Sequence, residues 1–142
     1  MKKCLNYALA YAVLAMAGGV FYREFTKFNG FEGVTALGKV HTHFFLLGMF
    51  MYLIAALFMR ESDFSSDKLF KAFRVVYNTG VPLTGIMLAV RGVFEVLGTE
   101  LSKGANAAIS GIAGIGHILT GVGVVMFIIV LKNSVKQKAG SK

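Results

Sequence analysis

Three histidines are the residues of this sequence best suited to chemistry, because all of them fall inside long apolar segments. His41 and His43 share one segment, and His117 belongs to another. Ionisable side chains inside a membrane-spanning helix are costly and usually mark a functional site. Since neutral imidazole nitrogens are common metal ligands, these positions predict a metal or haem site within the membrane.

Glycines flank two of these histidines on their own helix faces. One stripe at helical spacing contains Gly38, His41, Phe45, Gly48, Tyr52 and Ala55, and another contains Ser110, Gly114, His117, Gly121 and Val125. Two faces without side chains above and below an imidazole leave a flat slot, which suits a planar macrocycle. The stripes therefore predict haem b between His41 and His117. The residues expected around it are Gly38, Gly48, Tyr52, Gly114 and Gly121. Close packing between helices is the alternative explanation for the glycines.

His43 is the alternative ligand. It follows His41 by two positions, so the two side chains point about 200° apart and cannot both face one iron. Depth in the membrane favours His43 as the partner of His117, whereas periodicity favours His41. His43 has three open roles: an alternative ligand, a second metal or proton site, or a packed histidine bonded to a backbone carbonyl.

Arg91 is the expected counter-charge of the site. It lies in the same half of the predicted bundle as the histidines, on a polar stripe of the third apolar segment. Because guanidinium binds carboxylates in a bidentate manner, we expect Arg91 to pair with a haem propionate. An intrahelical ion pair with Glu95, four residues later, is the alternative.

Copper is the alternative to haem as the bound group. His41, His43 and either Met49 or Met51 would be the ligands of such a transition-metal module. A His-x-His pair on a continuous helix presents its nitrogens poorly to one ion. The sequence contains no catalytic triad, phosphate loop or paired carboxylates in its apolar segments, so no catalytic residues are assigned.

Four long apolar helices must position these residues. The 142-residue chain is 56% hydrophobic and 15% charged, whereas soluble domains are about 25% charged. The apolar runs predict helices over about 5–24, 36–59, 70–97 and 106–131, each near the ~20 residues that span a bilayer. Pro82 should bend the third helix. We expect an all-α fold: one transmembrane domain over 1–142, an up-down-up-down four-helix bundle in the bacterial inner membrane.

The basic residues predict the orientation of this bundle. Ten Lys and Arg residues lie at the two termini and in the second loop, and five lie in or near the other two connections. The positive-inside rule therefore places both termini, with a basic tail over 132–142, in the cytoplasm. A cleaved signal over 1–17 is an alternative interpretation of the first segment. The basic residues form no continuous stripe, so nucleic acid is not an expected partner.

The histidine helices resemble known haem proteins. The segment 40–50 has a His-x-His-x-x-x-x-Gly pattern that looks like a helix of NnrS-type haem and copper membrane proteins and, more loosely, the low-spin haem helix of haem-copper oxidase and nitric oxide reductase catalytic subunits. Segment 116–126 is similar to a His-x-x-Thr-x-Gly-x-x-Gly helix of the same proteins, with a different final glycine spacing. As a whole, the chain resembles a family of small four-span bacterial proteins of unknown function.

The haem-protein resemblance implies one b-type haem with His41 and His117 in the ligand positions. The chain has three histidines, too few for the second haem and copper of an oxygen-reducing centre, so an oxidase is not expected. The predicted functions are electron transfer, haem handling or sensing of nitric oxide or oxygen. A structural or assembly subunit without cofactor is the alternative. Expected partners are the lipid bilayer and either a second copy of the chain or a larger redox complex.

Overall fold

The computed structural model describes the backbone of residues 1–140, and all its regular elements are helices. The elements are α1 (Lys2–Phe28), α2 (Leu37–His43), η1 (Phe44–Phe50), α3 (Met51–Glu61), α4 (Lys68–Val96) and α5 (Lys103–Gly140). The segments α2, η1 and α3 follow one another without a break and form the second span, Leu37–Glu61. The prediction of an all-α fold with four apolar helices is therefore confirmed.

The four spans are longer than the sequence pattern predicts. In the part of the chain that the structure describes, the helices long and apolar enough to cross a membrane are Lys2–Phe28, Leu37–Glu61, Lys68–Val96 and Lys103–Val135. The helix α4 continues through Pro82. The backbone of α5 remains helical to Gly140, so most of the segment predicted as a separate tail prolongs the last helix. Residues 141 and 142 lie outside the described part.

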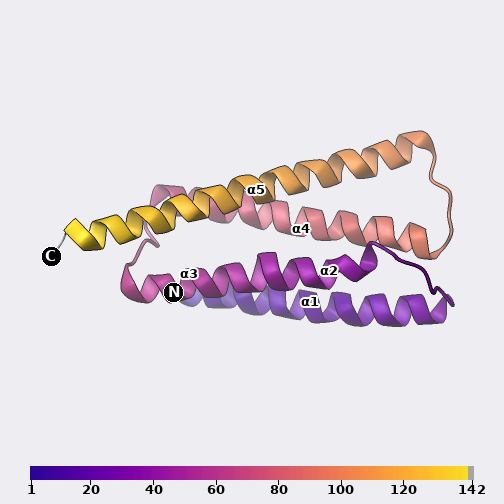
Figure 1. The fold of residues 1–142 in the computed structure, drawn as a ribbon, viewed down its shortest axis with the longest axis horizontal. Coiled ribbons are helices and arrows are strands. Elements are labelled where there is room, and N and C mark those ends of the chain that lie inside the picture. The colour runs from indigo at the N-terminus through magenta and orange to yellow at the C-terminus, as the bar shows by residue number, and fades with distance from the viewer. Residues whose placement is uncertain (141–142) are drawn as a thin grey trace.

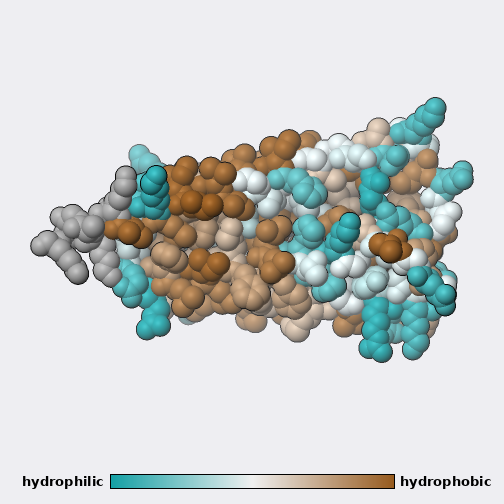
Figure 2. All heavy atoms as spheres, in the orientation of Figure 1, coloured by the Kyte–Doolittle hydropathy of each residue, from teal (hydrophilic) through white to brown (hydrophobic). Residues whose placement is uncertain are grey.

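The helices run alternately up and down, and both ends of the chain lie at the same end of the bundle (Figure 1). We call this the terminal end; it also contains the loop between α3 and α4. The far end contains the other two loops. The helix α1 packs along α2, η1 and α3, while α4 packs against α2 and, most extensively, against α5. Apolar surface covers much of the face drawn in Figure 2, and hydrophilic groups gather at both ends.

Aromatic side chains fill the core. Tyr52 of α3 and Tyr77 of α4 are fully buried, and their ring centroids are 6.4 Å apart. Phe73 lies 5.0 Å from the rings of both Tyr77 and Phe127, so α5 joins the same cluster. Tyr11 brings in α1, with its ring stacked 6.0 Å from that of Tyr52. One aromatic cluster therefore connects all four spans.

Small residues allow α4 and α5 to approach closely. A Cβ on Gly80 would lie 2.6 Å from the Thr120 amide nitrogen, and one on Gly116 would lie 2.7 Å from Thr84 Oγ1. Helices in lipid associate mainly through close backbone packing, which small residues permit. The contact with α4 is made by Gly116 and not by the neighbouring Gly114. The side of α5 that carries Gly114 is therefore left uncovered.

Candidate functional site

The structure brings His43 and His117 together. Their ring centroids are 6.4 Å apart, and the ring planes are nearly perpendicular, at 85°. His43 is the last residue of α2 and His117 lies in the middle part of α5. Two spans far apart in the sequence therefore place imidazoles opposite each other, and the histidine on the second span is His43, which the sequence pattern predicts as the alternative ligand.

Backbone hydrogen bonds orient both imidazoles in the same way. His43 Nδ1 lies 2.8 Å from the carbonyl oxygen of Lys39, and His117 Nδ1 lies 2.8 Å from that of Ala113. Because a carbonyl oxygen only accepts, each Nδ1 must carry the hydrogen. The Nε2 atom of each neutral ring then keeps its lone pair. Metal-ligating histidines commonly donate their other N–H in this way, which fixes the tautomer and the ring orientation.

His41 lies on the opposite side of its helix, against α1. Its ring stacks on Tyr22, with centroids 6.5 Å apart and planes at 12°. A Cβ on Gly19 would be 3.6 Å from His41 Cβ, so the His41 side chain packs against the backbone of α1 there. His41 Nδ1 is buried and has no hydrogen-bond partner among the residues that the structure describes. The expected pairing of His41 with His117 is therefore wrong, since the imidazole facing His117 is that of His43.

The two glycines of the first predicted stripe also face α1. Gly38 packs against the ring of Tyr22, and the ring of Tyr11 fills the space beside Gly48. Tyr52 lies in the aromatic cluster of the core. These residues therefore leave no slot beside His117. The physical reason is that small residues on both helices allow α1 and the second span to pack closely, which uses Gly38, His41 and Gly48 of the stripe.

The second predicted stripe remains open. His117 is exposed, and a Cβ added to Gly114 or Gly121 would meet no atom within 4 Å. The neighbouring apolar side chains of α5 are exposed as well, including Ile118 at 67% and Val125 at 58%. The face of α5 that carries His117 is thus bare above and below the imidazole, as the sequence predicts for that helix.

Arg91 of α4 reaches the same face of α5 near the far end of the bundle. Its Nη2 atom donates a 2.8 Å hydrogen bond to Ser110 Oγ and lies 3.4 Å from Asn106 Oδ1. Glu95 instead accepts a 2.6 Å hydrogen bond from the amide of Ala36. The two members of the alternative intrahelical pair thus have separate polar partners.

Sequence reasoning missed the π-helical segment η1, which begins directly after His43. Such segments are rare and are frequent at functional sites, and apolar periodicity gives no signal for them. The methionines of the copper alternative, Met49 and Met51, pack against the core cluster. Among the residues that the structure describes, His, Cys, Asp and Glu form no group of three or more that could hold a metal ion.

Comparison with known proteins gives one match. No curated protein matches the chain, and no solved structure matches it. The likeness of its histidine helices to haem-copper subunits therefore stays a sequence-based expectation. A family model described as "Protein of unknown function (DUF2871)" matches residues 1–134. Since this match covers nearly the whole chain, the protein belongs to that family.

Proposed function

We propose that this protein binds one b-type haem within the membrane, with His43 and His117 as axial ligands. The observation that supports the proposal is the 6.4 Å separation of the two imidazole centroids. An ion held in line between two imidazole nitrogens at about 2 Å from each puts the ring centroids roughly 6 to 6.5 Å apart. The paired rings therefore have the separation that one shared metal ion requires.

The number of ligands favours haem over a bare ion. The pair offers two nitrogens, whereas transition-metal ions in proteins usually take four or more ligands. Haem brings four nitrogens of its own, so that two axial imidazoles complete its coordination. Ligand sites in helix bundles are built from side chains on facing helices, and here His43 is half-buried while His117 lies on an exposed face of α5.

The α5 side of the proposed site suits a flat ring. The carbonyl groups of Lys39 and Ala113 hold the two imidazoles in one tautomer, which leaves Nε2 available for a metal. Gly114 and Gly121 keep the α5 side free of side chains. Arg91, already bonded to Ser110 on that face, supplies N–H donors for a carboxylate. We therefore keep Arg91 as the propionate partner.

Haem held in this way supplies one-electron redox chemistry. Because both axial positions would be filled by protein, electron transfer fits the residues better than sensing of nitric oxide or oxygen, which needs a vacant position. The apolar side chains of α5 near His117 are exposed on a helix long and apolar enough to cross a membrane, where lipid would surround them and would stabilise the less charged form of the iron centre. We place this activity in the bacterial inner membrane, with both termini in the cytoplasm.

Visible spectroscopy of the purified protein tests the proposal. Full-length protein produced with added haem precursor should show a reducible, six-coordinate, low-spin spectrum that carbon monoxide does not change. One haem should bind per chain in a titration with haemin. A colourless protein that also fails to bind haemin in the titration would overturn the proposal, and a carbon monoxide complex would overturn the bis-histidine assignment.

A cofactor-free assembly subunit is the second candidate, favoured by the uncovered glycine face of α5. Small residues on an exposed transmembrane face permit close association with another helix. Replacing Gly114 and Gly121 with leucine separates the two candidates. Loss of a dimer or larger complex from a colourless protein supports assembly, whereas loss of haemin binding with an unchanged oligomeric state supports the haem site.

A further inference from the structure

A basic hollow opens at the terminal end of the bundle, away from the histidines. It has a volume of about 360 Å³ and lies between the first turns of α1 and α4. Four cationic side chains line it: Lys2, Lys3, Lys71 and Arg74. None of the described residues in its lining carries a carboxylate. The hollow is therefore suited to an anion.

Arg74 is the anchor of this hollow. Its guanidinium carbon lies 5.7 Å from the centroid of the Phe70 ring, a cation–π contact that holds the group beside the hollow. Its Nε atom is buried and has no hydrogen-bond partner among the described residues. A planar guanidinium held in this way presents paired N–H donors that match phosphate oxygens.

The loop carboxylates nearest in sequence bond to backbone amides. Asp63 accepts a 2.9 Å hydrogen bond from the Ser65 amide, and this bond lowers the pKa of the Asp63 carboxyl group. Asp67 accepts a 2.6 Å hydrogen bond from the amide of Leu69 and caps α4. Neither aspartate lines the hollow.

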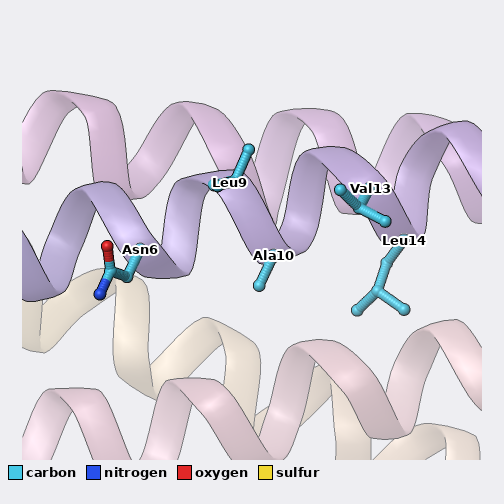
Figure 3. Close-up of a pocket in the computed structure, with 5 residues that line it drawn as sticks. All are labelled: Asn6, Leu9, Ala10, Val13 and Leu14. Carbon is cyan, nitrogen blue, oxygen red and sulfur yellow. The ribbon is translucent and has the colours of Figure 1, made fainter.

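An apolar groove continues from the basic hollow along α1. Lys3 and Arg74 also line a second hollow, which reaches Asn6 and Ala10. Asn6 and Ala10 in turn line a third, a groove of about 550 Å³ that extends to Leu14. Figure 3 shows the residues of this groove along one side of α1, with Asn6 as its one polar member. From Asn6 to Leu14 the groove runs about 12 Å towards the middle of the membrane.

We infer that the basic hollow and the apolar groove together bind one anionic phospholipid. Its phosphate lies on Arg74 and Lys71, and one acyl chain follows α1 from Asn6 to Leu14. The order of the three hollows matches the order of charge and apolar surface in such a lipid. In the proposed orientation the terminal end meets the cytoplasmic leaflet, whose anionic surface attracts juxtamembrane cations. This site is independent of the proposed haem.

Native mass spectrometry of the full-length protein tests this inference. The protein is transferred into micelles that contain phosphatidylglycerol and phosphatidylcholine with identical acyl chains. Wild-type protein should retain phosphatidylglycerol in preference to phosphatidylcholine, and the double variant Lys71→Gln/Arg74→Gln should lose about tenfold or more of that preference. The matched control, Lys39→Gln/Lys103→Gln, removes the same charge at the far end and should keep it.

Two further variants separate a built site from general attraction to a basic surface. Arg74→Lys keeps the charge but removes the planar donors, and Ala10→Phe fills the groove without changing charge. Each should lower phosphatidylglycerol retention severalfold, while Ala17→Phe, also on α1 but outside the groove, should not. Unchanged retention in both variants would overturn the inference, even if charge removal weakened binding.

A soluble anion is the other source of the same chemistry. Inorganic phosphate or glycerol phosphate at millimolar concentration should displace little phosphatidylglycerol, because neither has an acyl chain. Full displacement by either would show a site for soluble phosphate and overturn the lipid assignment. If Arg74→Gln fails to fold, Lys3→Gln/Lys71→Gln, which changes two exposed side chains, replaces it with the same expected loss.

Discussion

Two regions on opposite sides of the second span both combine histidine with glycine, but they are filled differently. On the α1 side, His41 stacks on Tyr22, and the ring of Tyr11 occupies the space beside Gly48. On the α5 side, His43 faces His117, and the glycines next to His117 have no neighbour within 4 Å. We call these regions the α1 seam and the α5 face. In the α1 seam, glycine allows aromatic packing; on the α5 face, glycine leaves space.

The difference teaches that a histidine between glycines does not by itself identify a ligand. The two kinds of site are distinguished by what the imidazole nitrogens contact. His41 Nδ1 is buried without a partner among the described residues, whereas His43 and His117 have Nδ1 bonded to carbonyl groups and Nε2 available. The α5 face therefore has the free nitrogens that the proposed haem needs, and the α1 seam has the properties of a packed core.

Substitution of the histidines should show the largest difference between the two regions, measured as haem affinity. His43→Ala and His117→Ala should each lower haem affinity by about 100-fold or more, since even the outer-shell partners of metal ligands are worth about 10- to 100-fold. His41→Ala is the matched control and should leave affinity close to that of wild type. Haemin titration followed by visible absorbance measures all three. Loss of binding in His41→Ala with retention in His43→Ala would return the ligand role to His41.

Adding one methyl group to a glycine should separate the two regions by stability. In Gly48→Ala the new Cβ would lie 2.7 Å from Tyr11 Cβ, so α1 must shift. We expect a loss of about 1–3 kcal/mol, as for other overpacked cores. Gly121→Ala meets open space and should leave stability unchanged or slightly raised.

Unfolding of each glycine variant in mixed detergent micelles measures this difference. The haemin affinity of Gly48→Ala should stay near wild type wherever the protein remains folded. Equal destabilisation by the two substitutions would mean that the α5 face is covered in the folded protein, and the open-face description would then be wrong.

The sequence predicts the spans well and the contacts of each helix face poorly. Runs of apolar residues locate four helices because the membrane requires their length. Lipid and protein interior are both apolar, so periodicity cannot tell which face of a membrane helix meets a neighbour. The stripe of His41 was therefore identified correctly as a small-residue face but assigned to α5 instead of α1. The open face around His117 was predictable because both glycines lie within one turn of it.

His43 shows a second limit of sequence reasoning. Its bond to a backbone carbonyl was expected to compete with a ligand role. In the structure that bond uses Nδ1 only, which leaves Nε2 for a metal. The π-helical segment that starts after His43 has no signal in the apolar pattern. The ligand assignment thus depended on three-dimensional packing.

Arg91→Ala should weaken haem binding to a smaller extent than loss of an axial ligand. Removal of its charge-assisted hydrogen bonds should lower affinity by about tenfold, since such bonds are worth roughly 1.5 kcal/mol or more. Lys103→Ala removes an exposed cation of the same end and should have little effect. Unchanged haem retention and midpoint potential in Arg91→Ala would exclude the propionate contact and leave Arg91 as a link between α4 and Ser110.

Tyr11→Phe should have the smallest effect, and it tests how the α1 seam is closed. The hydroxyl group donates a 2.8 Å hydrogen bond to Asn78 Oδ1, while the ring fills the space beside Gly48. Hydrogen bonds between membrane helices average about 0.6 kcal/mol, so stability should fall by about that amount. A double-mutant cycle with Asn78→Ala isolates the bond.

Ring shape, not this hydrogen bond, should keep the α1 seam closed. The haemin affinity and spectrum of Tyr11→Phe should therefore match those of wild type, because the phenyl ring still holds α1 against Gly48. A coupling energy of several kcal/mol in the cycle, or an altered haem spectrum, would show that the two regions are linked through Asn78 of α4. The α1 seam and the α5 face would then belong to one polar network, and the description of them as two independent regions would be wrong.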